Sequence, residues 1–217
     1  MQINLTDVQM MLDLILNALH ESGIAAINIY KDWYWTIAYE EAYHTLKKPT
    51  ECEIGSLVDD WEWLEKVLCK ENPSTTLDFE RLGNVIRILK KNVYPEETKS
   101  KCLVFINLSD VAKLVTQILQ KTDKAGFDTI STNINTYWAA KPEDEYNFNQ
   151  EPAIIEKSFS EDWNYLKNNL SDSNATSSDV LESFSRLLMI IGEEIKNSPL
   201  IVNWLVCEQK HDCTKAL

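Results

Sequence analysis

The sequence predicts a mostly α-helical protein. It would consist of two tandem homologous units of about three helices each, with an irregular or short-strand aromatic connector in each unit, plus a C-terminal helix. The first of three supporting observations is a repeat, since INLTDV at residues 3–8 returns as INLSDV at residues 106–111. The second is the scarcity of turn formers, 5 Gly and 6 Pro in 217 residues, because an all-β chain needs a turn about every 8–12 residues. The third is the helical spacing of apolar residues.

The repeat runs through the whole length of both units. The second copy begins 103 residues after the first (106 − 3), and the shift becomes 102 after a single deletion. Tyr-Trp at 34–35 returns at 137–138, and Asp-Trp at 60–61 returns at 162–163. Matched Trp residues are hard to obtain by chance because the chain has only 7 of them. We therefore interpret the chain as a duplication.

The predicted domain boundaries follow from this repeat. The first unit covers residues 1–98, the second covers 104–197, and a tail covers 198–217. The junction at 93–101 is polar and charged and contains Pro95, as expected of a linker. We expect the two units to pack as one body. We also expect a monomer, because two packed copies replace a dimer of single units.

The first segment of each unit is predicted to be an amphipathic helix, because apolar residues recur at steps of three and four. In the two copies these residues are Val8, Met11, Leu12, Ile15, Leu16 and Leu19, and Val111, Leu114, Val115, Ile118 and Leu119. Thr6 and Ser109 are the predicted N-caps, since a hydroxyl can accept a hydrogen bond from a free backbone N–H. Gly23 and Gly126 are predicted to follow the helix ends, where φ is positive.

The remaining elements are a connector, two further helices and the tail. INIYKDWYWTI at residues 27–37 and its copy at 130–140 are expected to be extended, since the first is rich in β-branched and aromatic residues. In the first copy Ser56 and Asp59 form a capping box that begins a second helix. The tail from Ser198 is expected to add one more helix. A third helix carries the apolar stripes Phe79, Leu82, Val85, Ile86 and Leu89, and Leu181, Phe184, Leu187, Leu188 and Ile191.

The charge balance narrows the class of partner. Asp and Glu total 34 against 21 Lys and Arg, which gives a net charge of −13 at pH 7. We therefore expect no nucleic-acid partner, because binding the phosphate backbone requires a basic patch. A basic protein, by contrast, would be attracted to such a surface. The alternative interpretation is that the charge serves only solubility.

The chain is predicted to be cytoplasmic. Its start, MQINLTDVQMM, lacks the basic region and apolar core of a signal peptide. The late apolar run at residues 200–207 is interrupted by Asn203. It is far shorter than the roughly 20 residues of a spanning helix, so no membrane partner is expected. The five cysteines are an odd number without dense spacing, which fits a reducing compartment.

The sequence contains no recognisable catalytic motif. It has neither a P-loop nor a GxGxxG segment. Paired acids such as Asp59 and Asp60 are better explained as helix caps, because adjacent helical residues do not face each other. We therefore predict that the protein is not an enzyme and has no catalytic residue. A hydrolase site around His44, with Tyr43 and Glu41, is the least favoured alternative.

Three potential zinc ligands lie near the C-terminus. Cys207, His211 and Cys213 fall within seven residues. A tetrahedral zinc site needs a fourth ligand, and no CxxC pair supplies one. We therefore predict no metal and no cofactor.

The predicted partner-binding residues are aromatic and acidic. Aromatic side chains beside acids are typical of a hot spot for a basic protein. Tyr34 and Trp35 return in the second unit and are interpreted as core, whereas Trp33 and Tyr39 are unmatched. Repeats share what the fold needs and differ where only one copy performs a function. The predicted partner-binding residues are Asp32, Trp33, Tyr39, Glu40, Glu41 and Trp63.

One further pattern can be written as YW…Y…P…SLxDDWxxL. Its main residues are Tyr34, Trp35, Pro49, Asp60, Trp61 and Leu64. With its matches in the second unit, this pattern resembles bacterial immunity proteins of the contact-dependent growth inhibition (polymorphic toxin) type. The resemblance implies a non-enzymatic cytoplasmic protein that binds one toxin domain, often a nuclease, and blocks its active site.

The charge argument is compatible with this resemblance. Nucleases that hold phosphates are usually basic, so an acidic inhibitor gains association rate and complementarity. The alternative function is an acidic adaptor or regulatory scaffold that binds a different protein.

Overall fold

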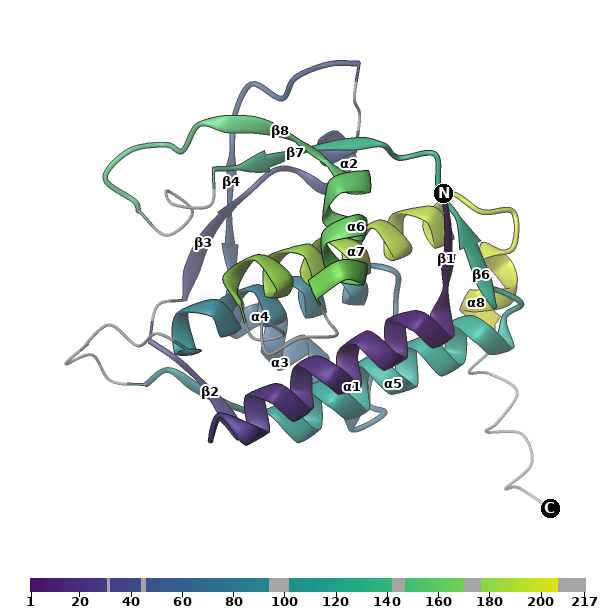
Figure 1. Ribbon diagram of the computed structural model, residues 1–217, viewed down its shortest axis with the longest axis horizontal. Helices are drawn as coiled ribbons and strands as arrows, with labels where there is room; N and C mark the ends of the chain where they lie inside the picture. Colours follow the sequence, from purple (N-terminus) through teal and green to yellow (C-terminus); the bar gives the residue numbers. More distant parts are fainter. Residues whose placement is uncertain (31, 44–45, 94–101, 142–146, 170–176, 207–217) are drawn as a thin grey trace.

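The computed structural model describes residues 1–30, 32–43, 46–93, 102–141, 147–169 and 177–206 (Figure 1). In the first half of the chain the elements are β1 (Gln2–Asn4), α1 (Leu5–Glu21), β2 (Ala26–Ile29), β3 (Trp33–Thr36), α2 (Tyr39–Ala42), β4 (Glu53–Ser56), α3 (Leu57–Leu68) and α4 (Leu77–Val93). In the second half they are β5 (Val104–Asn107), α5 (Leu108–Lys124), β6 (Thr129–Ser131), β7 (Thr136–Ala140), β8 (Ile154–Ser158), α6 (Phe159–Asn169), α7 (Ser178–Lys196) and α8 (Ile201–Val206).

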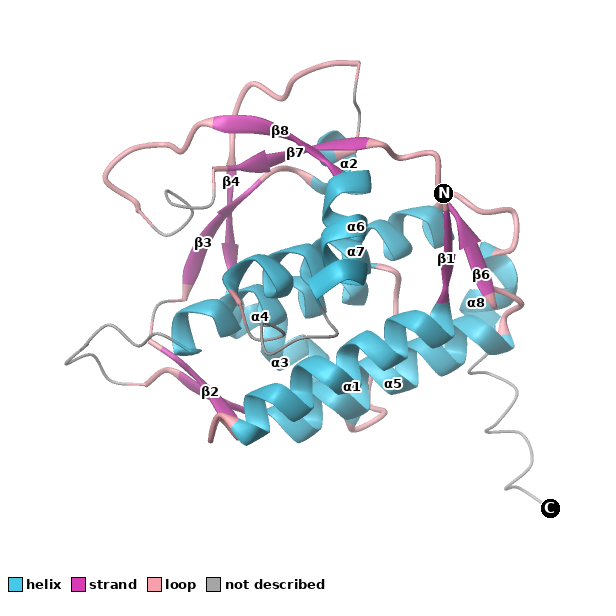
Figure 2. Cartoon of the chain, in the orientation of Figure 1, coloured by secondary structure: helices cyan, strands magenta, loops and turns pink. Residues whose placement is uncertain are grey.

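The prediction of a mostly α-helical fold is wrong, because the protein is mixed α/β. Its described residues form eight strands in four two-stranded antiparallel sheets, beside the helices (Figure 2). The expected connectors at residues 27–37 and 130–140 contain the strands β2 and β3, and β6 and β7. The scarcity of Gly and Pro was misleading, since none of these four sheets is closed by a tight hairpin turn.

Two of the sheets join the first half of the chain to the second. β1 pairs with β6, where Ile3 is opposite Ile130, and β2 pairs with β5, where Ile27 is opposite Ile106. All four isoleucines are buried. The long helices follow the same arrangement, with α1 beside α5 and α4 against α7 (Figure 1). Each half of the chain therefore supplies one strand to each of two shared sheets. The predicted unit boundaries, 1–98 and 104–197, stay a prediction.

Helices α4 and α7 cross at the centre of the core. Two glycines permit their close approach: a Cβ added to Gly83 would lie 2.8 Å from the Met189 methyl, and one added to Gly192 would lie 2.8 Å from the Phe79 Cβ. The apolar stripes predicted for these helices are buried. The two remaining sheets, β3–β4 and β7–β8, pack near these helices on one side of the core (Figure 1). Each joins two successive strands through a long connection, and we call them hairpins.

The helix caps show which local signals were informative. Ser56 caps α3 as predicted, with its Oγ accepting from Asp59 N at 3.0 Å. Gly23 and Gly126 have φ of +79° and +96° beyond the ends of α1 and α5, also as predicted. The predicted caps Thr6 and Ser109 are wrong, because the two helices begin earlier and Asn4 and Asn107 occupy the N-cap positions. The asparagines end the short strands that precede the helices.

The helix predicted for the tail is α8, whose Trp204 is fully buried. Across the described part of the chain, no helix is both long enough and apolar enough to cross a membrane.

Candidate functional site

Asp32, one of the predicted binding residues, holds helix α3 in place. Its carboxylate accepts from Ser56 Oγ at 2.8 Å and from Val58 N at 2.9 Å. Its backbone oxygen accepts from Leu57 N at 2.9 Å. These three bonds engage Asp32 at the start of α3, so the structure gives it a local role as a cap.

The other predicted residues lie on three elements. Trp33 begins strand β3, and its side chain is 53% exposed. Glu41 is exposed on α2, which also contains Tyr39 and Glu40, whose side chains lie outside the described part of the structure. Trp63 lies on α3 and is half-buried, with the Arg81 guanidinium 4.7 Å from its ring centre. Trp33 is therefore the most accessible aromatic side chain described in this set.

The exposed side of the β3–β4 hairpin is the candidate site. Trp33 is paired with Ser56, and Trp35 with Ile54, so these side chains share one face. Ile54 is 54% exposed. Trp35 was predicted to be core but is half-buried: it stacks on Phe148 with 5.4 Å between ring centres, and its Nε1 donates to Asn147 O at 3.1 Å. We call Trp33, Trp35, Ile54 and Phe148 the hairpin face.

The other hairpin provides an internal comparison. In β7–β8, Thr136 is paired with Ser158, and Trp138 with Glu156. Thr136 therefore occupies the position of Trp33, and Glu156 that of Ile54. The same hairpin thus has exposed apolar residues in the first half of the chain and polar ones in the second. Sequence reasoning missed Ile54, because its match to Glu156 becomes clear only from the strand register.

A polar network fixes the inner side of the β3–β4 hairpin. The Tyr34 hydroxyl donates to Asp60 Oδ2 at 2.8 Å and accepts from Asn84 Nδ2 at 2.6 Å. Asn84 Oδ1 accepts from Arg87 Nη2 at 3.0 Å, and the Arg87 guanidinium lies over the Tyr34 ring. Burial raises the pKa of Asp60, although the bonds from Tyr34 and Asn84 oppose this shift. Burial, together with Asp60, also raises the pKa of Tyr34, so its hydroxyl stays protonated.

A related network lies beneath the β7–β8 hairpin. The Tyr137 hydroxyl donates to Asp162 Oδ2 at 2.6 Å, and Ser183 Oγ donates to Asp162 Oδ1 at 3.3 Å. The Arg186 guanidinium lies over the Tyr137 ring, at 5.4 Å from its centre. Because the Tyr–Asp pair occurs under both hairpins, we assign it to folding and not to function.

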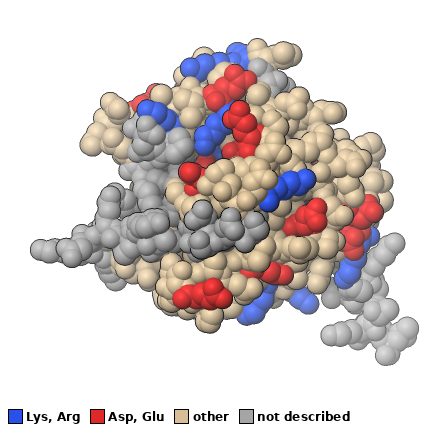
Figure 3. Space-filling view, viewed as in Figure 1, with Lys and Arg blue, Asp and Glu red and all other residues tan. Residues whose placement is uncertain are grey.

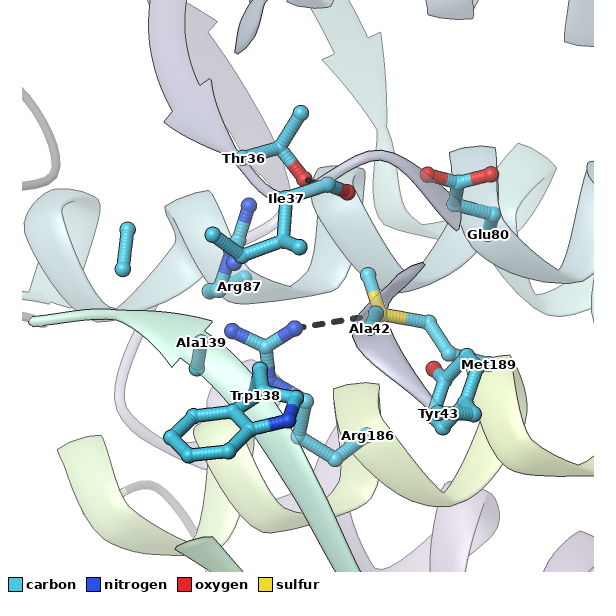
Figure 4. Close-up of a pocket in the computed structure, with 11 residues that line it drawn as sticks. Thr36, Ile37, Ala42, Tyr43, Glu80, Arg87, Trp138, Ala139, Arg186 and Met189 are labelled. Atoms are coloured by element: carbon cyan, nitrogen blue, oxygen red, sulfur yellow. Dashed lines mark hydrogen bonds between the residues drawn. The ribbon is translucent and has the colours of Figure 1, made fainter. Parts of the chain in front are cut away.

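A small cavity lies between the two networks (Figure 4). Arg87 from α4 and Arg186 from α7 enter it, and Tyr43 and Glu80 also line it. Burial, helped by the nearby Asp60 carboxylate, raises the pKa of Glu80 to about 7. The cavity volume of about 10 Å³ is at the lower limit for a single water molecule.

This cavity gives little support to the hydrolase alternative. Tyr43 lines the cavity and burial raises its pKa, whereas Glu41 is exposed and lines a separate, more open pocket of about 270 Å³ with residues 46–50. His44 lies outside the described residues. A space that holds about one water has no room for a substrate beside Tyr43.

Charges of both signs are mixed on the one face of the molecule that Figure 3 shows. No single acidic patch dominates this face. The net charge of −13 acts on an approaching charged molecule through the summed field of the whole protein. Among the described residues, no group of three or more His, Cys, Asp or Glu side chains could hold a metal ion. Cys207, His211 and Cys213 lie outside those residues.

Comparison of the chain with models of known protein families, with curated proteins and with solved structures found no match.

Proposed function

We propose that this chain is a non-enzymatic cytoplasmic protein that binds a basic toxin domain, a nuclease, and occludes its active site. We further propose that it binds this partner through the hairpin face. The observation that carries the proposal is the asymmetry between the two hairpins. Trp33 and Ile54 are about half exposed, whereas the matching positions have Thr136 and Glu156.

The asymmetry separates function from folding. Both hairpins bury their tyrosine, Tyr34 or Tyr137, against the core. Thr136 and Glu156 show that this type of hairpin tolerates polar residues at the outer positions. Folding alone therefore does not require Trp33 and Ile54 to be apolar. An exposed apolar patch on a protein surface is typical of a site that binds another protein, and Trp is enriched among interface hot spots.

The net charge indicates the chemistry of the partner. A protein with a net charge of −13 repels acidic surfaces and attracts basic ones over about a Debye length. A nuclease that binds phosphates offers such a basic surface. The partner would then be attracted by charge and held by contact with the hairpin face.

Co-expression of the chain with the product of the adjacent gene tests this proposal. The adjacent product should be toxic alone, harmless together with this chain, and recovered in a stable complex with it. The double variant Trp33→Thr and Ile54→Glu copies the other hairpin and should lose protection.

A double variant on the other hairpin, Thr136→Ala and Glu156→Ala, is the matched control and should protect like the wild type. If the adjacent product is harmless and forms no complex, the proposal fails. If it forms a complex but is not toxic, the adaptor function replaces the toxin-neutralising one.

A further inference from the structure

A second exposed apolar patch lies on the β2–β5 ladder. Phe105 is paired with Asn28, and beyond the last pair of the ladder, Ile29 with Val104, Leu103 N donates to Ile29 O at 2.7 Å. Phe105, Leu103 and Tyr30 are 59%, 52% and 37% exposed. Leu103 is two residues before Phe105, and Tyr30 is two residues after Asn28, the partner of Phe105, so the alternation of extended chain puts the three on one face. We call these three residues the ladder face.

The matching ladder, β1–β6, is polar at the positions that correspond to Phe105 and Tyr30, and Leu103 has no counterpart in it. There Gln2 is paired with Ser131, as Phe105 is paired with Asn28. Asn133 lies 103 residues after Tyr30, which is the offset of the repeat, and it is exposed. The exposed face of this ladder is therefore apolar in one of its two copies only. The same holds for the hairpin face.

The two apolar faces are neighbours. Tyr30 is the first residue after β2, and Trp33 is the first residue of β3. Three residues of chain span at most about 11 Å between their Cα atoms. Figure 1 shows β2 and β3 one after the other along the same side of the molecule. A single partner can therefore reach both faces at once.

The hairpin face alone is small for a specific interface. A standard interface covers about 800 Å² of each partner, and a fully covered aromatic side chain supplies roughly 150–250 Å². Trp33 and Ile54 are only about half exposed, and Trp35 is already covered in part by Phe148. The ladder face adds three further side chains on the same side of the molecule.

We infer that the ladder face is the second half of the docking surface for the same basic protein partner, which binds one side of the molecule in a 1:1 complex. This inference rests on the proposed function. The net charge of −13 favours a basic partner over a second, equally acidic copy of this chain.

Titration of the full-length protein with the purified product of the adjacent gene tests the inference. The double variant Tyr30→Asn and Phe105→Gln, which copies residues 133 and 2, should weaken affinity by about tenfold or more. Leu103→Ser is a single variant for the same face and should also weaken binding. Gln2→Ala with Asn133→Ala is the matched control and should bind like the wild type. Because all these positions are exposed, the unfolding midpoints should stay unchanged.

The outcomes separate the two proposals. If the wild type binds and the ladder variants bind equally well, the inference is overturned while the proposed function stands. If the wild type does not bind, the proposed function fails and the inference fails with it. If the protein alone sediments as a dimer that the ladder variants dissociate, the occupant is a second copy, which also overturns the inference.

Discussion

The Tyr34 hydroxyl bridges a buried carboxylate and a buried amide. Replacing Tyr34 with Phe removes the hydroxyl's bond to the Asp60 carboxylate and its bond from Asn84, and leaves only the longer bond from Asn84 Nδ2 to Asp60 Oδ2, at 3.2 Å, to join the two. We expect a loss of about 1–3 kcal/mol in the free energy of unfolding, measured by urea denaturation. Tyr137→Phe breaks only the bond to Asp162 among those described for that hydroxyl and should cost less. An unchanged midpoint for Tyr34→Phe would show that the network adds no stability.

Glu80 should make stability depend on pH near neutrality. Its pKa is about 7 in the folded protein against an ordinary value of 4.5, because burial and Asp60 outweigh Arg81, Arg87 and Arg186. Between these values the folded state binds more protons than the unfolded state, so the free energy of unfolding falls as pH rises.

Glu80→Gln tests this pH dependence. The variant should remove most of the fall, about 1–3 kcal/mol between pH 5 and pH 8, as measured by chemical denaturation at each pH. Equal slopes for the wild type and the variant would contradict the account of this carboxyl group.

At the scale of elements, Trp204 is the main side chain that attaches α8 to the core, beside the partly buried Ile201. Trp204 is fully buried, its Nε1 donates to Thr122 Oγ1 at 3.0 Å, and Lys121 Nζ lies 3.7 Å from its ring centre. Trp204→Ala should therefore lower the free energy of unfolding by about 3–5 kcal/mol, as measured by thermal or urea denaturation. Val202→Ser changes an exposed residue of the same helix and is the control. Similar small effects from both variants would mean that α8 contributes little to stability.

Sequence reasoning succeeded where the signal was local. The Ser56 cap, the two positive-φ glycines and the apolar stripes of α4 and α7 each depend on a few neighbouring residues. The strands β1 and β5, and the pairing of the expected extended segments β2 and β6 with them, were missed because the partners are about 80–130 residues apart, as shown by Ile27 with Ile106 and Ile3 with Ile130. No local turn residue marks such a pairing.

The candidate site was predicted only in part for the same reason. Trp33 was readable because it is an aromatic residue without a match in the second unit. Asp32 was chosen for its charge, yet its carboxylate caps α3. Ile54 and Phe105 become candidates only when the strand register shows which residues of the second half occupy the matching positions.

At the scale of the whole molecule, the shared sheets should make unfolding a single cooperative step. β1 and β2 cannot leave β6 and β5 without exposing buried isoleucines of both halves. We expect urea unfolding followed by Trp fluorescence and by far-UV circular dichroism to give coincident transitions. Two separated transitions would show that the halves fold as independent units.

At this scale we propose that the hairpin face and the ladder face bind a partner, while the matching β7–β8 hairpin and β1–β6 ladder do not. Hydroxyl-radical footprinting of the complex with the adjacent gene product measures this directly, since it reports the exposure of each side chain. We predict that binding protects Trp33, Ile54 and Phe105 and leaves Trp138 unchanged. Protection of the β7–β8 hairpin, or equal protection of both hairpins, would contradict the claim.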